Sequence, residues 1–194
     1  MKQKIKTITV YASSSSRIAP VYFDAAHELG TLLAQYDITC INGGGNNGLM
    51  AAVTDAVLSG GGKVSGIIPR FMVNKGWLHP SLTETVVTPG MHRRKQLMAK
   101  KPDACIALPG GVGTLDELME IIAWKQLGLY PHPIVILNTN DYYGDLLTLL
   151  ERAQKENFLE ATPSPLWSVA STAKEALDIL LNGPQEDNLR ALPQ

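Results

Sequence analysis

The sequence has little cysteine, almost no net charge and no long hydrophobic run, and each scarcity excludes a class of protein. Among 194 residues, the two cysteines Cys40 and Cys105 lie in apolar runs and are too few for a disulfide framework. We therefore expect buried free thiols in a cytoplasmic protein. A formal net charge of −1 predicts no global attraction to nucleic acid or to an anionic membrane. No apolar run approaches the roughly 18 residues that a membrane span needs.

Patterns for a bound metal or a common cofactor are also missing. The four histidines are far apart and neither H-x-x-x-H nor C-x-x-C occurs, so we expect no metal site. Gly43, Gly45 and Gly48 spell G-x-G-x-x-G, but they follow the second predicted strand rather than the first. The next predicted strand also lacks a terminal acid for a ribose, which disfavours NAD. There is no G-K-[ST] motif, so the chain has no P-loop, and we expect no cofactor.

Short apolar runs alternate with amphipathic segments along most of the chain. The runs predict strands over 5–12, 37–42, 63–69, 84–88, 103–109, 133–138 and 166–171. The amphipathic segments predict helices over 19–36, 49–60, 91–100, 114–129, 142–156 and 172–181. This alternation is typical of an α/β fold with a buried, mostly parallel sheet that is covered on both faces.

The predicted elements divide the chain simply. Residues 1–182 are predicted to form a single domain, and residues 183–194 a C-terminal tail. The segment 69–82 has no clear hydrophobic period. A loop of that length in a compact domain is usually a lid or a binding loop, and we expect one here.

Two glycine-rich loops each follow a predicted strand and open a predicted helix. They are INGGGNNGLM at 41–50 and LPGGVGTLDE at 108–117. In α/β folds ligands bind outside the carboxyl ends of the strands. Glycine lets the backbone approach a ligand closely, and a helix N-terminus offers unpaired N–H groups. Two such loops predict an anionic ligand, most simply a phosphate, although each could also be a tight turn that binds nothing.

Glu117 has two possible roles. Thr114 and Glu117 have the T-x-x-E spacing of a capping box, which is a sufficient structural reason for both residues, and the helix dipole explains Asp116. However, Arg94 shares a helix side with apolar neighbours in MHRRKQLMAK and should turn inward. A buried arginine needs an anionic partner, either a phosphate or Glu117. These residues alone leave both roles of Glu117 open.

Several motifs then resemble one known family. PGGVGTLDE resembles the PGGxGTxxE signature of the LONELY GUY (LOG) family of cytokinin-activating nucleoside monophosphate phosphoribohydrolases, formerly labelled lysine decarboxylase-like. GGGNNGLM and MHRRK are similar to two further family motifs, in the same order and spacing from about residue 7 to 160. The resemblance implies a Rossmann-like three-layer α/β/α fold, a homodimer, and hydrolysis of a nucleoside 5′-monophosphate such as AMP to a base and ribose 5-phosphate.

The resemblance also implies where the site lies. The catalytic arginine of the family falls on Arg94 and its catalytic glutamate on Glu117. With this resemblance, our hypothesis is that Glu117 both caps its helix and catalyses. The implied substrate-binding residues are Ser14, Gly44, Gly45, Met91, Arg94, Lys95, Gly110, Gly111, Val112, Gly113, Thr114, Leu115 and Asp116.

The sequence departs from the family pattern at three positions. Arg93 stands where glutamate or glutamine is common, but it should face away from the site. Ala123 replaces a threonine of the plant members, and Ser13 stands where glycine is usual. These differences bear on base preference more than on the reaction.

Two other functions compete with the hydrolase. A nucleotide or molybdenum-cofactor carrier on the same fold would bind phosphate without releasing a base, and the pairing of Arg94 with Glu117 argues against it. A pyridoxal phosphate decarboxylase is disfavoured, because no lysine lies in a convincing Schiff-base context.

Overall fold

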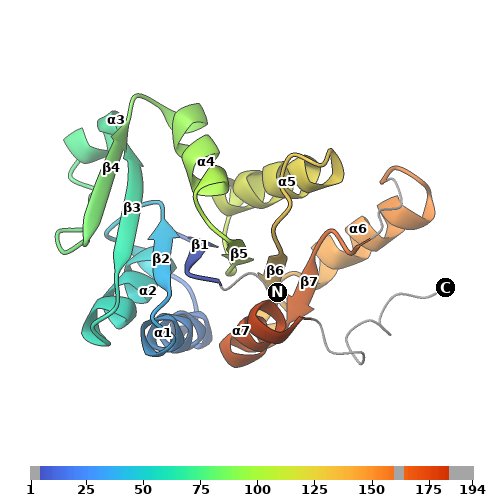
Figure 1. The fold of residues 1–194 in the computed structure, drawn as a ribbon, viewed down its shortest axis with the longest axis horizontal. Coiled ribbons are helices and arrows are strands. Elements are labelled where there is room, and N and C mark those ends of the chain that lie inside the picture. The colour runs from blue at the N-terminus through green and yellow to red at the C-terminus, as the bar shows by residue number, and fades with distance from the viewer. Residues whose placement is uncertain (1–4, 160–163, 184–194) are drawn as a thin grey trace.

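A seven-stranded, entirely parallel sheet organises the chain (Figure 1). The computed structural model describes residues 5–159 and 164–183, so nearly all of the predicted tail lies outside the described residues. The strands are β1 (Thr7–Tyr11), β2 (Thr39–Asn42), β3 (Val64–Pro69), β4 (Glu84–Thr88), β5 (Ala104–Ala107), β6 (Ile134–Leu137) and β7 (Ser168–Ala170). Their order in the sheet is β4-β3-β2-β1-β5-β6-β7.

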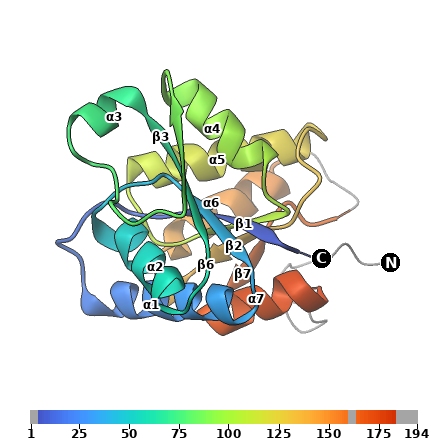
Figure 2. The ribbon, with the colours of Figure 1, turned by 60° about the vertical axis from the view of Figure 1, so that its left-hand side comes forward.

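Helices cover both faces of this sheet. They are α1 (Pro20–Gln35), α2 (Gly48–Ser59), α3 (Arg70–Asn74), α4 (Met91–Lys100), α5 (Val112–Gln126), α6 (Gly144–Lys155) and α7 (Ala173–Asn182), with a short 3-10 turn η1 (Thr139–Asp141). Figure 2 shows α1, α2 and α7 on one face and α4 and α5 on the other. The predicted α/β class and the three-layer arrangement are confirmed, and the sheet is parallel throughout rather than mostly so.

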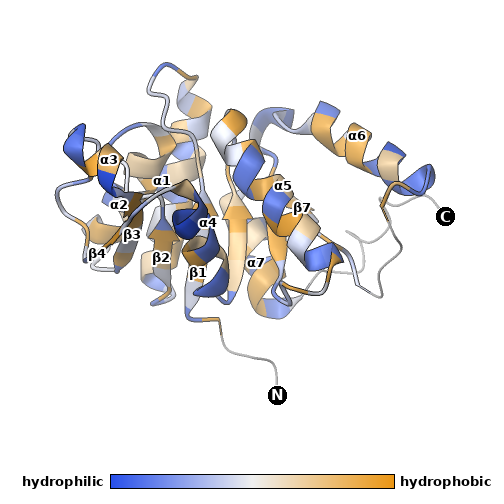
Figure 3. Cartoon of the chain, turned by 90° about the horizontal axis from the view of Figure 1, so that it is seen from above, coloured by the Kyte–Doolittle hydropathy of each residue, from blue (hydrophilic) through white to orange (hydrophobic). Residues whose placement is uncertain are grey.

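The sequence forms these layers because its strands are apolar on both sides. Along β1, Ile8 and Val10 face the core under α1, α2 and α7, whereas Tyr11 joins the core under α4 and α5. The cysteines follow the same rule, with Cys40 in the first core and Cys105 in the second. Both are buried free thiols, as predicted. Figure 3 shows the strands in hydrophobic colours and α4 in mostly hydrophilic ones.

The strand order reverses beside β1, and this places the site. The chain first builds β2, β3 and β4 outward on one side of β1, and then returns to place β5 on the other side. The loops after β2 and β5 therefore leave the same end of the sheet on either side of β1. In open parallel sheets such a switch point is where ligands bind.

The segment 69–82 differs from the irregular loop that we expected. It begins with the short helix α3, and its second half is anchored to the first glycine loop. The N–H of Asn46 donates to the Trp77 carbonyl at 3.0 Å, and the N–H of His79 donates to the Gly44 carbonyl at 2.9 Å. An isolated bridge pairs Gly45 with Leu78. This part of the segment is fixed to the sheet end by backbone hydrogen bonds that hydrophobic periodicity does not reveal.

Candidate active site

The loop from β5 into α5 begins the helix without a capping side chain. The N-cap is Gly111, and no side chain accepts a hydrogen bond from the first turn. The predicted capping box is therefore wrong, because α5 starts two residues earlier than expected and Thr114 and Glu117 lie inside it. Gly110 is required here, since a Cβ at this position would lie 2.1 Å from Thr114 Oγ1. Val112 and Gly113 are exposed, and no described group accepts from their N–H groups.

The loop from β2 into α2 is internally bonded instead. Asn42 is buried, its amide donates to Thr54 Oγ1 at 2.9 Å, and its carbonyl oxygen accepts from the Gly44 N–H at 2.9 Å. Gly44 has φ +69°, which favours glycine. The Gly45 N–H points at Met50 Sδ at 3.1 Å. The N–H groups of Gly44 and Gly45 are thus engaged within the protein.

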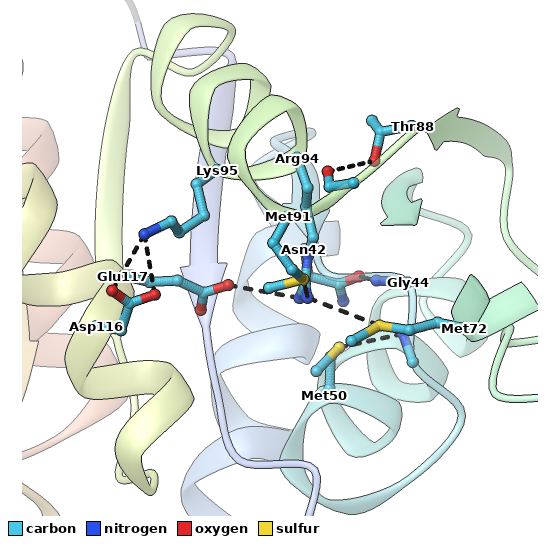
Figure 4. A network of polar contacts seen from close by, with 12 residues as sticks. Asn42, Gly44, Met50, Met72, Thr88, Met91, Arg94, Lys95, Asp116 and Glu117 are labelled. Carbon is cyan, nitrogen blue, oxygen red and sulfur yellow. Dashed lines mark hydrogen bonds and ion pairs between the residues drawn. The ribbon is translucent and has the colours of Figure 1, made fainter. Parts of the chain in front are cut away.

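Arg94 lies between these two loops (Figure 4). Its side chain comes from α4, is buried, and points at Glu117 on α5, with Nη2 3.4 Å from Glu117 Oε1. Among the described residues, the polar contacts of Nη1 are with the sulfur atoms of Met72 at 3.9 Å and Met91 at 3.7 Å. Nε has no hydrogen-bond partner in the described part of the chain. A guanidinium offers five N–H donors, so Arg94 keeps donors for an anionic ligand.

Burial sets the protonation of Glu117. The carboxyl is 7% exposed, and burial raises its pKa to about 7, with Asp116 and Glu120 adding to the rise. The positive charges of Arg94 and Lys95 lower the pKa but do not offset the burial. A carboxyl whose pKa is near neutrality can exchange a proton or a charge at physiological pH, which is typical of catalytic groups.

Lys95 ties α4 to α5 on the outer side of this pair. Its Nζ lies 3.1 and 3.0 Å from the two Asp116 carboxylate oxygens and 3.2 Å from Glu120 Oε1. Burial of Lys95 opposes its charge, but these two carboxylates outweigh the burial and raise its pKa. Lys95 therefore helps to hold the helix that carries Arg94 against the helix that carries Glu117. Arg93, as expected, is exposed and bonds to Gln96.

The remaining predicted residues lie around this centre at different depths. Ser14 is exposed in the turn after β1, which contacts the start of α2 through the Met50 N–H and the Ser13 carbonyl at 3.2 Å. Leu115 packs against the core under α4 and α5. Among the described residues, no hydrogen bond or ion pair joins Ser14 or Leu115 to Arg94 or Glu117. The predicted residues that do lie beside the pair or its loops are Met91, Gly110, Thr114 and Asp116.

Sequence reasoning missed four residues that shape the site: Asn42, Gly43, Met50 and Met72. Asn42 ends its strand directly before three glycines, a position from which an amide can brace a turn, and that signal was readable. Gly43 and Met50 carry no sequence signal that separates them from their neighbours. Met72 lies in the segment without a period and reaches Arg94 only through the fold.

The described ranges contain neither a metal cluster nor a membrane-spanning helix. Within residues 5–159 and 164–183, no group of three histidine, cysteine, aspartate or glutamate side chains is placed to hold a metal ion. None of the helices there is both long and apolar enough to cross a bilayer.

Comparison with known proteins gives the family. The family model described as "Possible lysine decarboxylase" matches residues 50–180. LOG1 of Arabidopsis thaliana, a cytokinin riboside 5′-monophosphate phosphoribohydrolase, is 41% identical over 175 residues, which cover 90% of this chain and 82% of LOG1. LOG3 of the same plant is 42% identical over 174 residues, 90% of this chain and 81% of LOG3. This chain belongs to the LOG family. The family resemblance read from PGGVGTLDE and its companion motifs is confirmed.

Solved structures support the fold. The Moco carrier protein of Chlamydomonas reinhardtii superposes with a TM-score of 0.69 at 20% identity, covering 97% of this chain and 100% of the carrier. The molybdenum cofactor binding protein of Rippkaea orientalis has a TM-score of 0.65 at 22% identity, covering 92% and 96%. At such identities the likeness extends to the fold alone, so the LOG family and the carriers share one scaffold.

Proposed function

We propose that this protein hydrolyses the N-glycosidic bond of a nucleoside 5′-monophosphate and releases a free base and ribose 5-phosphate. The observation that carries the proposal is the buried pair of Arg94 and Glu117 at the switch point, with unused donors on the arginine and a carboxyl pKa of about 7. The names of the relatives supply the reaction class, since LOG1 and LOG3 are cytokinin riboside 5′-monophosphate phosphoribohydrolases.

The site has one feature for each demand of this reaction. The phosphate is a dianion, and the free N–H groups at the start of α5 together with Arg94 suit it. Cleavage of a glycosidic bond builds positive charge on the ribose, which becomes oxocarbenium-like. We assign the ionised Glu117 carboxylate to stabilise that charge and to take a proton from the attacking water. Arg94 orients Glu117 through the 3.4 Å contact.

The substrate within this class follows from the relatives. Cytokinin riboside monophosphates carry an apolar group on the adenine, and AMP lacks it. The thioethers of Met72 and Met91 beside Arg94 give one wall of the site an apolar, adaptable surface. We therefore propose that both AMP and N6-isopentenyl-AMP are substrates.

The test is direct product detection. Purified protein is incubated without added metal with AMP, GMP, CMP and N6-isopentenyl-AMP, and with the matching nucleosides. We expect a free base and ribose 5-phosphate from the adenine monophosphates and nothing from the nucleosides. Tight binding of the nucleotides without release of any base would contradict the hydrolase and favour a carrier on the same fold.

Homodimerisation and a cytoplasmic location belong to the same proposal. Ile122 of α5 is buried in the core, but Leu127 and Leu129 after the helix are 70% and 67% exposed. Large exposed apolar side chains that gather at one helix end are typical of a contact with another chain. The two buried free cysteines suit a reducing compartment. Light scattering of the purified protein tests the dimer.

A further inference from the structure

Gly43 has the tightest close approach of any glycine in the described chain. A Cβ built on Gly43 would lie 1.9 Å from Arg94 Nη2 and 3.0 Å from Arg94 Cζ. The guanidinium therefore lies directly against the backbone of the β2–α2 loop. No side chain larger than a hydrogen atom fits at position 43 while Arg94 keeps its place.

Four residues surround the guanidinium of Arg94 in its observed position. The guanidinium lies between the Gly43 backbone and Glu117, with the sulfur atoms of Met72 and Met91 beside Nη1. The loop under it is braced by Asn42 and by the anchored segment that follows α3, so the backbone of Gly43 is a fixed surface. If a side chain is added at position 43, we therefore expect the Arg94 side chain to move and the backbone of the β2–α2 loop to stay in place.

We infer that Gly43 is the positioning residue for Arg94: its bare backbone forms the seat that aims the guanidinium at Glu117. This inference rests on the proposed function for its kinetic consequences, but the placement of Arg94 is independent of any reaction. It gives the first glycine of GGGNNGLM a purpose different from that of Gly44, whose positive φ serves the turn. Gly43 is not among the glycines with positive φ, so alanine suits its backbone. The main resistance to substitution is the contact with Arg94, and the sulfur of the flexible Met50 side chain follows at 3.0 Å.

A matched pair of substitutions separates positioning from packing. In Gly43→Ala the new methyl meets the far end of a flexible side chain, which swings away at small cost to stability. In Gly30→Ala the methyl meets Ala56 Cβ at 2.6 Å and the Val53 carbonyl oxygen at 2.7 Å, between helices α1 and α2. Those atoms are stiff and far from the site, so this variant should lose stability and keep its activity.

The expected results are opposite for the two variants. Gly43→Ala should melt within about 3 °C of the parent protein and lose roughly 10²-fold in kcat/KM for AMP, the cost of a misplaced catalytic group. Gly30→Ala should melt several degrees lower and keep kcat/KM within about twofold when assayed well below its melting temperature. If Gly30→Ala does not fold, Gly60→Ala replaces it, because its Cβ meets only Ala34 Cβ at 2.6 Å and other atoms from 3.6 Å outward.

A double-mutant cycle tests whether Gly43 acts through Arg94. In an Arg94→Lys background the guanidinium is gone, and a methyl group at position 43 meets only Met50 Sδ at 3.0 Å among the neighbours found in the parent protein, which needs an adjustment of a few tenths of an ångström at the end of a flexible side chain. Adding Gly43→Ala should then change the remaining kcat/KM less than twofold. A second loss of roughly 10²-fold would show that position 43 touches the substrate itself, and would overturn the inference.

A readout without catalysis separates this inference from the proposed function. The pKa of Glu117 is followed by the pH dependence of its side-chain carboxyl carbon in NMR spectra. Arg94 lowers that pKa, so Gly43→Ala should raise it, while Gly30→Ala should leave it unchanged. A raised pKa in a protein that releases no base would keep the positioning role and reject the hydrolase. An unchanged pKa in Gly43→Ala would overturn the positioning role whatever the activity.

Discussion

The two glycine loops look alike in sequence, but the fold holds them in opposite ways. In the β2–α2 loop, the N–H groups of Gly44, Gly45 and Asn46 all find acceptors within the protein. In the β5–α5 loop, the carbonyl groups are held instead. Tyr142 donates to the Gly110 carbonyl at 2.8 Å, and Tyr143 donates at 2.7 Å to the carbonyl of Leu108, the residue after β5.

This difference separates two tasks that glycine-rich loops are usually assigned together. In the β2–α2 loop, the N–H groups of Gly44, Gly45 and Asn46 brace the loop itself, and Arg94 packs against its backbone at Gly43. In the β5–α5 loop, the N–H groups of Val112 and Gly113 have no acceptor among the described residues, and the Gly110 carbonyl is bonded to Tyr142, so we expect this loop to be the better anion site. The sequence predicts an anionic ligand at both loops, and the structure leads us to propose that the phosphate meets the β5–α5 loop while the β2–α2 loop mainly supports Arg94.

The largest effect on activity should come from Glu117, which lies in α5 after the β5–α5 loop. Glu117→Gln keeps the shape of the side chain and an oxygen for Arg94, but it cannot carry a charge or accept a proton. We expect kcat for AMP to fall by roughly 10²–10⁴-fold with the fold intact. Rates measured by chromatography of adenine, with circular dichroism as a check of folding, test this. A Gln variant with full turnover would end the catalytic assignment of Glu117.

The role of the β5–α5 loop in phosphate binding can be tested by removing one of its N–H groups. Val112 is the first residue of α5, where proline is tolerated, and Gly111 before it has an extended backbone that suits a following proline. Val112→Pro should raise KM for AMP by about 10- to 100-fold, since a hydrogen bond to a charged group contributes about 1.5–3 kcal/mol. Val112→Ala keeps the N–H group and is the control. Equal KM values for the two variants would mean that this N–H group does not meet the phosphate.

Substitution in the β2–α2 loop should mainly lower the free energy of unfolding. Asn42→Ala removes the amide that bonds to Thr54 and Gly44 and leaves a buried N–H group without its acceptor. We expect a loss of about 1–3 kcal/mol in the free energy of unfolding. Chemical denaturation measures it. A variant as stable as the parent would show that the backbone hydrogen bonds to the segment after α3 hold the loop without Asn42. It would contradict the view that the β2–α2 loop is braced by its own hydrogen bonds.

A smaller effect links stability to pH. A carboxyl whose pKa rises on folding, from 4.5 to about 7 for Glu117, binds its proton more tightly in the folded protein. Its contribution to stability therefore falls as the pH rises from 4.5 through 7. Glu117→Gln lacks this loss, so it should gain on the parent by about 1–3 kcal/mol between about pH 5 and pH 8. A melting-temperature difference that stays constant over this range would contradict the raised pKa.

Much of this could be predicted from the sequence because the signals were local. The β-branched runs and the amphipathic helices around them define the layers, and the inward side of MHRRKQLMAK placed Arg94 correctly. Glu117 was found for a partly wrong reason, since the capping box does not form. T-x-x-E predicts a helix start at Thr114, but Gly110 and Gly111 let the helix begin earlier and moved Glu117 into its second turn.

The rest depended on contacts between distant segments. Nothing local to Met72 or Trp77 shows that they lie over the first glycine loop, because backbone hydrogen bonds between residues about thirty positions apart set that arrangement. The two loops likewise differ through Asn42 and Tyr142, and the second of these reaches its loop from 32 residues away. Sequence patterns indicate which loops matter, but not which of their N–H groups remain free.

The most direct test of the account is the pH dependence of kcat/KM for AMP. If the ionised carboxylate of Glu117 acts in the reaction, kcat/KM should fall about tenfold per unit below a pKa of about 7. The phosphate of the substrate has a pKa of about 6. The pH profile of the residual kcat/KM of Glu117→Gln should therefore show only the fall caused by the phosphate, near that pKa. A value of kcat/KM that is constant from about pH 5.5 to 8, or that rises below about pH 7, would contradict the role of Glu117.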